Sequence, residues 1–239
     1  MAIPVIESST ASQSSGTANT LDATEPTGLA NDDLILIIIA NDAGNTETDQ
    51  FDSSTNKPTG FTLILETGSA TPDCHIAAFW RIRTGTESWP IACPAASTND
   101  MCLYTLRISG VDTTTPIDPT LGATKNVTGV NNADVLGFET AVNDSLAFCI
   151  ASFDGGDGDP FTTASSGWTM IASQDSGSSA SSVASVGYAN KDMATAGATG
   201  TCNVASSGQA DGWSAYQFAI APGAGGENTS ILVPTGPWR

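Results

Sequence analysis

The chain has 239 residues, and 25 acidic against 7 basic side chains give it a formal net charge of −18. Phosphate backbones and anionic membrane surfaces repel such a charge, so the composition argues against nucleic-acid and membrane partners. Only 13% of the residues are charged, and Gly, Ser, Thr, Ala and Asn fill the segments between short apolar runs, as in strands joined by many turns. The length suits one large all-β domain, since such domains often reach roughly 200 to 250 residues.

The N-terminal segment, residues 1–20, is rich in serine and is predicted to be an extended arm anchored by Ile3, Val5 and Ile6. It lacks the basic start and the apolar core of about 7 to 15 residues that mark a secretory signal. The longest apolar run, residues 34–40, is too short to span a bilayer. If the protein works outside cells, we expect it to leave them by lysis or inside an assembly.

An internal repeat organises residues 21–222. Asn31-Asp32-Asp33-Leu34 returns as Asn143-Asp144-Ser145-Leu146, a shift of 112 positions (143 − 31). Repeats this long predict two halves of one core, about 21–130 and 131–222, rather than a solenoid with a period of about 20 to 50 residues. The other matched landmarks are Gly60-Phe61-Thr62-Leu63-Ile64 with Gly167-Trp168-Thr169-Met170-Ile171, Trp80 with Tyr188, and Tyr104, Leu106 and Ile108 with Tyr216, Phe218 and Ile220.

Each half is predicted to supply four main strands and one weaker strand. Together they favour an all-β fold, a jelly-roll-like β-sandwich built from two internally repeated halves. The expected strands lie near 33–41, 61–66, 75–83 and 102–109, with a weaker one at 88–93, and near 145–153, 168–173, 182–190 and 213–221, with a weaker one at 200–204.

The C-terminal segment, 223–239, is predicted to be a flexible tail. It begins with the hinge Gly223-Ala224-Gly225-Gly226 and then carries apolar residues that cannot build a core of their own. We expect them to dock on this domain, on a neighbouring subunit or on a larger assembly. These residues are Ile231, Leu232, Val233 and Trp238.

The first strand of the first half has two apolar faces. Ile35, Ile37 and Ile39 stand where the second half has the smaller Ala147, Cys149 and Ala151. An antiparallel sandwich strand usually needs only one apolar face. The isoleucines must therefore be covered either by an arm of the same chain or by another subunit, and the prediction favours the subunit.

Three of the seven basic residues lie on outward positions of strands that can share a sheet. Alternation along the strands places Arg81, Arg83 and Arg107 opposite the apolar set. Two interpretations stay open. The arginines are solvated or paired with local carboxylates, or they form a docking strip for an acidic neighbour.

The residues that usually carry chemistry are not arranged as a catalytic motif. The one histidine, His75, starts a predicted strand, and a Gly-x-Ser-x-Gly elbow is absent from the sequence, so a structural or surface histidine is favoured over a Ser-His-Asp triad. Acidic residues that fall in loops or at strand ends show no glycosidase motif. These are Glu47, Glu66, Glu87 and Glu139. We predict a protein that is not an enzyme, with no catalytic residues and no cofactor.

The five cysteines show no zinc or redox spacing. Cys149 lies inside a predicted strand and is expected to be a small buried apolar residue. Cys93 and Cys102 flank a loop between two predicted strands, so a disulfide between them stays open.

One loop resembles a metal-binding loop. Asp154, Asp157 and Asp159 alternate with glycines, as carboxylates around a calcium ion often do. The loop lacks full EF-hand spacing and the terminal bidentate Glu, so a plain surface loop is favoured and no metal site is assigned.

Four segments of turn and core residues form a recognisable set: Pro26-Thr27-Gly28-Leu29-Ala30-Asn31-Asp32-Asp33-Leu34-Ile35, Pro58-Thr59-Gly60-Phe61-Thr62-Leu63-Ile64, Ser109-Gly110-Val111-Asp112 and Thr115-Pro116-Ile117-Asp118. They resemble a β-sandwich module of virion proteins in tailed bacteriophages, found in head decoration (cement) proteins and in fibres. The resemblance covers roughly residues 20–222 and carries no catalytic residues.

The resemblance implies a structural role in a virion. We expect a capsid decoration protein that stabilises a phage head by bridging capsid subunits, with the major capsid protein or another virion protein as partner. A homo-oligomer, a trimer by preference, is expected. The alternative is a fibre or receptor-binding module that recognises surface glycans.

Overall fold

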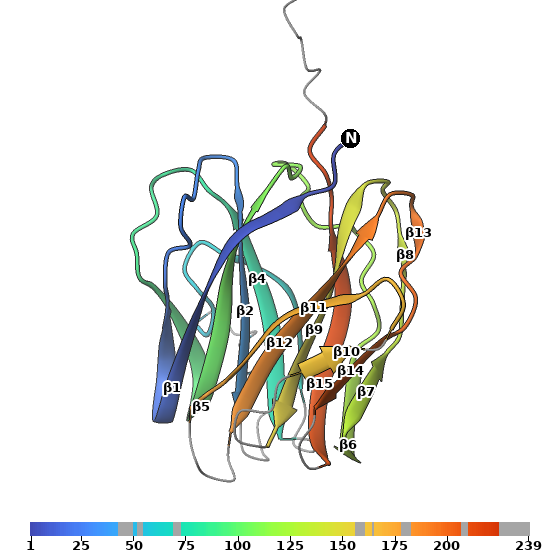
Figure 1. The fold of residues 1–239 in the computed structure, drawn as a ribbon. Coiled ribbons are helices and arrows are strands. Elements are labelled where there is room, and N and C mark those ends of the chain that lie inside the picture. The colour runs from blue at the N-terminus through green and yellow to red at the C-terminus, as the bar shows by residue number, and fades with distance from the viewer. Residues whose placement is uncertain are drawn as a thin grey trace, which may run out of the picture.

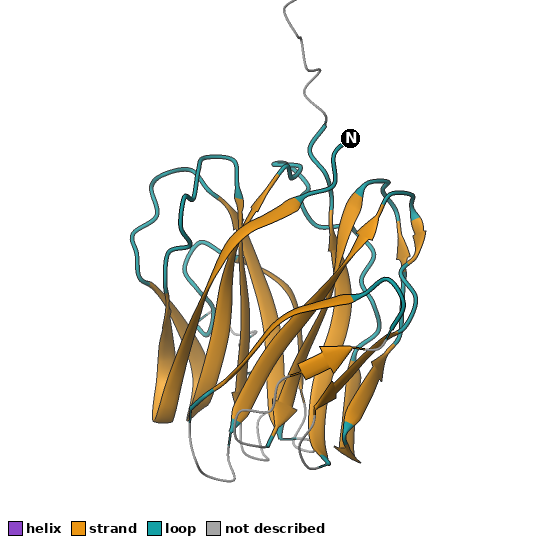
Figure 2. Ribbon diagram, viewed as in Figure 1, coloured by secondary structure: helices purple, strands orange, loops and turns teal. Residues whose placement is uncertain are grey.

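The computed structural model describes residues 1–42, 50–51, 55–68, 73–155, 161–163, 165–177, 183–206 and 210–224. Every regular element in these ranges is a β-strand, and two five-stranded antiparallel sheets face each other (Figures 1 and 2). The predicted class, an all-β sandwich, is therefore confirmed.

The strands of the first large sheet come from residues 5–109 and those of the second from residues 125–220. The first sheet has the spatial order β1 (Val5–Ala23), β5 (Ile91–Ser109), β2 (Leu34–Asp42), β4 (Cys74–Ile82) and β3 (Thr62–Gly68). The second has the order β6 (Lys125–Val130), β15 (Asp211–Ile220), β9 (Ser145–Asp154), β12 (Ala184–Met193) and β11 (Thr169–Asp175). A cover sheet contains β10 (Phe161–Thr163), β14 (Cys202–Ser206) and β7 (Asn132–Val135), and a ribbon pairs β13 (Gly197–Ala198) with β8 (Glu139–Thr140).

The two large sheets have the same strand order when β2 is matched with β9, β3 with β11, β4 with β12, β5 with β15 and β1 with β6. β3 and β11 share a register irregularity, between Leu63 and Leu65 and between Met170 and Ala172. In the first sheet β2 lies beside β4 and not beside β3, and in the second sheet β9 lies beside β12 and not beside β11. This differs from the order of a Greek key, in which consecutive strands are neighbours. Equal strand orders are what repeated halves predict, and a common origin of the halves stays a prediction.

The register corrects one matched landmark. Thr62 pairs with Trp80 in the first sheet, and its counterpart Thr169 pairs with Asn190 in the second. Trp80 therefore corresponds to Asn190, and the predicted match with Tyr188 is wrong by two residues. The apolar pattern could not show this, because a shift of two keeps a side chain on the same face.

The N-terminal arm expected over residues 1–20 is part of the sheet instead. β1 pairs with β5 from Val5 opposite Ser109 to Ala23 opposite Ile91, with three register irregularities. The boundary at residue 20 is therefore wrong. Serine and threonine give β1 no apolar alternation, so the sequence pattern carried no strand signal although the backbone pairs almost throughout.

The central core lies between the two large sheets and confirms the inward faces expected for both halves. Leu36 and Ile38 of β2 face the layer that contains Phe148 of β9. Tyr104 and Tyr188 bridge the sheets edge to face, with ring centroids 5.3 Å apart and an interplanar angle of 73°. Such aromatic pairs add roughly 0.5 to 1.5 kcal/mol beyond their buried area.

A second core covers the outer face of the first sheet. Ile35, Ile37 and Ile39 are each 0% exposed and pack against residues from β1, from β5 and from two turns. The covering residues are Leu21, Ala23, Cys93, Ala95, Phe51 and Phe61. The isoleucines are thus covered by their own chain, and the predicted subunit contact through them is wrong. β1 and β5 have 19 residues each against 9 in β2, which leaves enough strand to reach over this face.

The outer face of the second sheet is covered by the cover sheet. Ala147, Cys149 and Ala151 pack there with Val135 of β7 and Val204 of β14. Cys149 is fully buried, as predicted for a small apolar residue. Both sheets therefore have an apolar core on each side.

Substituting Ile37→Asp tests this arrangement. The new carboxylate would lie in an apolar core without a partner, so we expect a loss of about 4 kcal/mol or more of unfolding free energy. Urea unfolding followed by tryptophan fluorescence measures the loss. Ile171→Asp is the control, since Ile171 is 43% exposed and should cost less than about 1 kcal/mol. A folded Ile37→Asp protein with normal stability would contradict the assignment.

Candidate functional site

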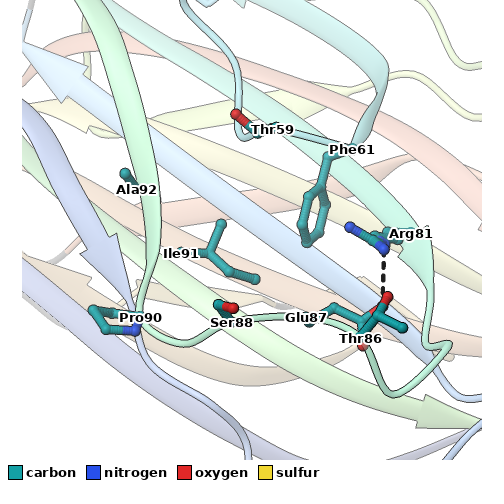
Figure 3. A pocket seen from close by; sticks show the side chains of 9 residues that line it. All are labelled: Thr59, Phe61, Arg81, Thr86, Glu87, Ser88, Pro90, Ile91 and Ala92. Carbon is teal, nitrogen blue, oxygen red and sulfur yellow. Dashed lines mark ion pairs between the residues drawn. The ribbon is translucent and has the colours of Figure 1, made fainter.

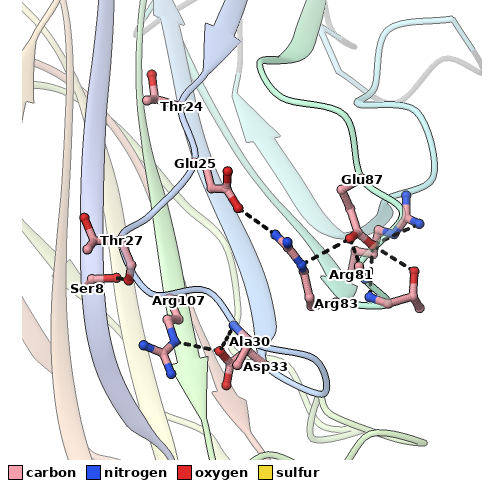
Figure 4. A network of polar contacts seen from close by, with 12 residues as sticks. Ser8, Thr24, Glu25, Thr27, Ala30, Asp33, Arg81, Arg83, Glu87 and Arg107 are labelled. Carbon is pink, nitrogen blue, oxygen red and sulfur yellow. Dashed lines mark hydrogen bonds and ion pairs between the residues drawn. The ribbon is translucent and has the colours of Figure 1, made fainter.

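Three arginines, two in strands of the first sheet and Arg83 directly after β4, form ion pairs along one end of the outer face of that sheet (Figure 4). Arg107 donates from Nε to Asp33 Oδ2 over 2.6 Å. Arg83 donates from Nη1 to Glu25 Oε1 over 2.8 Å, and its Nε lies 3.4 Å from Glu87 Oε2. Arg81 of β4 and Arg107 of β5 share a sheet as predicted, whereas Arg83 follows directly after β4. Of the two open interpretations, the structure has local pairing with carboxylates.

Glu87 joins two of these arginines. Arg81 Nη2 lies 3.1 Å from Glu87 Oε1, and the Glu87 side chain is 1% exposed. The carboxylate also accepts hydrogen bonds from Thr84 N, Thr84 Oγ1 and Gly85 N at 3.0 to 3.1 Å. Burial raises the pKa of Glu87, but the Thr84 hydrogen bonds and the Arg81 charge outweigh it and leave the pKa lowered. The loop before β5 is thereby fixed against the sheet.

A pocket of about 270 Å³ opens beside this cluster and is called the Arg81 pocket (Figure 3). Two turns enclose it, one before β3 and one between β4 and β5. Gly60 has φ +79°, and a Cβ there would lie 2.6 Å from Arg81 Nη1, so glycine is required where the guanidinium lies. The lining residues are Thr59, Phe61, Arg81, Thr86, Glu87, Ser88, Pro90, Ile91 and Ala92.

Sequence reasoning found part of this pocket. Phe61 and the turn at Gly60 were matched landmarks, and Arg81 was a predicted surface residue. Glu87 shows no motif in the sequence, because its role depends on contacts between segments that no local pattern encodes.

The equivalent place in the second half is built differently. Lys191 pairs with Ala147 as Arg81 pairs with Ile35, and it lies over Gly167 as Arg81 lies over Gly60. Its Nζ donates to Thr199 O over 2.6 Å. The Lys191 ammonium group is thus bound to a backbone carbonyl of the same chain.

A buried polar cluster lies at the other end of the same outer face. Glu66 Oε1 accepts hydrogen bonds from Gln50 N at 2.7 Å and Phe51 N at 3.1 Å, and Asn41 Nδ2 donates to Gln50 Oε1 over 3.0 Å. His75 is fully buried, and its Nδ1 lies 3.6 Å from Glu66 Oε1. These contacts hold Phe51 over the outer core, so the chain's histidine has a structural environment, as favoured.

The His75 ring also explains a glycine. A Cβ on Gly68 would lie 2.1 Å from His75 Nδ1. Gly68→Ala should therefore cost about 1 to 3 kcal/mol of unfolding free energy, because the buried ring cannot move aside. In a His75→Ala background the cost should fall to near zero, and chemical denaturation of the four proteins measures this coupling. Equal costs in both backgrounds would show that the ring is not the cause.

Four aspartates come together at the end of the sandwich where β2 and β9 finish. Burial and the neighbouring charges of Asp42, Asp211 and Asp73 raise the pKa of Asp154 to about 8. The described residues contain no group of three or more His, Cys, Asp or Glu side chains suited to a metal ion. Asp157 and Asp159 lie outside the described residues, so the calcium alternative for that loop stays open.

The raised pKa predicts how stability changes with pH. A carboxyl group whose pKa is higher in the folded than in the unfolded chain stabilises the fold at low pH, and this contribution is lost as pH rises from about 4 through about 8. Asp154→Asn should therefore raise the melting temperature at pH 8 to 9 and change it little near pH 5. Thermal melts over this range, with a calcium chelator as control, test it. An equal effect at every pH would contradict the assignment.

The five cysteines are free and buried. Cys93 packs in the outer core of the first sheet, whereas Cys102 lies in the central core and donates to Ala184 O over 3.3 Å. The two side chains are on opposite faces, so the disulfide left open above does not form. Burial raises the pKa of the Cys93 thiol to about 12, which keeps it protonated at neutral pH.

The apolar tail residues Ile231, Leu232, Val233 and Trp238 lie outside the described residues, and their docking role stays a prediction. No helix in the described ranges has the length and apolarity needed to cross a membrane. Comparison of the chain with family models, with curated proteins and with solved structures gives no match in any of the three. The resemblance to phage virion proteins is thus untested by relatives.

Proposed function

We propose that this protein is a structural component of a virion, a capsid decoration (cement) protein that stabilises a phage head by bridging capsid subunits. The partners would be the major capsid protein or another virion protein and further copies of this chain, in a trimer by preference. It would work through contact surfaces and not as an enzyme.

The observation that carries this proposal is that both ends of the described chain lie at one end of the sandwich (Figure 1). Gly223 donates from N to Gly110 O over 2.8 Å, and Pro222 forms an isolated bridge with Val111. Ala2 and Gly223 line the same hollow. The chain after Gly223 therefore begins at the same end of the sandwich as the N-terminus, and this supports attachment through that end.

The interior supports a role that depends on rigidity. Apolar cores cover both faces of each large sheet, and the three arginines along the first sheet are paired with carboxylates of the same chain. An oligomer contact would use other surfaces than Ile35, Ile37 and Ile39. A module of this kind adds stability to a partner by binding its folded form.

Particle binding tests the proposal. Heads assembled without this protein should bind the full chain, and a chain lacking residues 225–239 should bind much more weakly, because multivalent attachment multiplies a modest gain from each tail. Cosedimentation measures the binding, and a variant with a scrambled tail of equal composition is the control.

Two outcomes would count against parts of this proposal. Equal binding of the truncated chain would show that the tail is not the anchor. An electron-microscopy map that places the chain on fibres instead of the head would favour the alternative, a fibre or receptor-binding module.

A further inference from the structure

We infer that the Arg81 pocket binds an acidic sugar, a single ring whose carboxylate pairs with Arg81. The inference does not rest on the proposed virion role, because it concerns what the purified chain binds in solution.

The charge of the pocket comes from Arg81. Its side chain is 27% exposed, whereas the Glu87 side chain beside it is 1% exposed. Glu87 is held by Thr84, Gly85, Arg81 and Arg83, so its capacity to accept is used within the protein. Glu87 also lines the pocket, but its oxygens are occupied, so the more exposed Arg81 guanidinium is the group that a ligand can pair with, and an anionic group is the matching partner.

The shape of the cation selects a carboxylate. A guanidinium carries five N–H donors in a planar fork, and Arg81 reaches Glu87 through Nη2. The fork matches the two oxygens of a carboxylate, which makes the pairing both stronger and more directional than a contact with a neutral oxygen.

The pocket is fixed in advance. Glu87 ties the loop to the sheet, and the absence of a side chain at Gly60 leaves room for the guanidinium. A rigid arginine loses little conformational freedom when a ligand arrives, so more of the interaction energy appears as affinity.

The remaining lining fits a sugar ring. Phe61 and Ile91 form an apolar wall suited to ring C–H groups, while Thr59, Thr86 and Ser88 offer hydroxyls that both donate and accept (Figure 3). A volume of about 270 Å³ is just below the range of about 300 to 1,000 Å³ for drug-sized ligands. One ring, rather than a chain of sugars, is therefore the ligand.

Calorimetry and saturation-transfer NMR on the full chain test the inference with sodium glucuronate, glucose and sodium sulfate as probes. Glucuronate should bind in the millimolar range. Glucose and sulfate should each bind about tenfold more weakly, because glucose lacks the carboxylate and sulfate lacks the sugar ring. Equal binding of glucose would overturn the role of the carboxylate. Equal binding of sulfate would overturn the role of the ring.

Three variants locate the site. Arg81→Gln should weaken glucuronate binding about tenfold, because a charged hydrogen-bonding partner is lost. Ala92→Trp fills the pocket from an exposed position and keeps both Arg81 and Glu87, so it should abolish binding even if Arg81→Gln folds poorly. Arg107→Lys is the control, since Arg107 pairs with Asp33, does not contact Glu87 and does not line the pocket. Unchanged binding by Ala92→Trp, or no glucuronate binding by the native chain, would overturn the inference.

Discussion

The structure depends on the need to cover two apolar faces on each central strand. β2 and β9 are buried along nearly their whole length, on both sides of their sheets. Each isoleucine removed from water contributes roughly 1.5 to 3 kcal/mol, so an open outer face would forfeit much of the stability of the first sheet. Strands of the same chain provide the cover. β1 and β5 extend beyond the other strands of the first sheet and cover its outer face, and the cover sheet packs on the outer face of the second sheet.

The same constraint explains where the halves differ. Large isoleucines occupy the outer face of β2, and small residues occupy that of β9. The second half makes up the volume with three aromatic rings, Phe153 at the end of β9, Trp213 of β15 and Phe161 of the cover sheet, which lie 4.5 to 6.4 Å apart. Equal strand orders are thus compatible with different packing, because the sum of side-chain volumes across an interface matters more than the residue at each position.

Alternation of apolar and polar residues was enough to predict strands and their buried faces. It was not enough to predict features that depend on contacts between distant parts of the chain. Apolar alternation predicted the central strands, the inward set of Tyr104 and Leu106, and the buried Cys149. It missed β1, whose serines and threonines carry no periodic signal. It also favoured a subunit over the same chain as the cover of Ile37, which is wrong, because alternation identifies an apolar face but not its partner.

The two ends of the sandwich carry different charged groups, so the molecule is electrostatically asymmetric along its strands. The arginines, the carboxylates paired with them and both ends of the described chain lie toward one end, while Asp42, Asp73, Asp154 and Asp211 gather at the other. Burial and the neighbouring charges raise the pKa of Asp154 to about 8 there, whereas Glu25, Glu87 and Asp33 at the other end are paired with arginines. If the proposed attachment is right, the arginine end meets the shell, and its paired carboxylates reduce repulsion from an acidic neighbour. The acidic end then faces solvent, where like charge keeps particles apart.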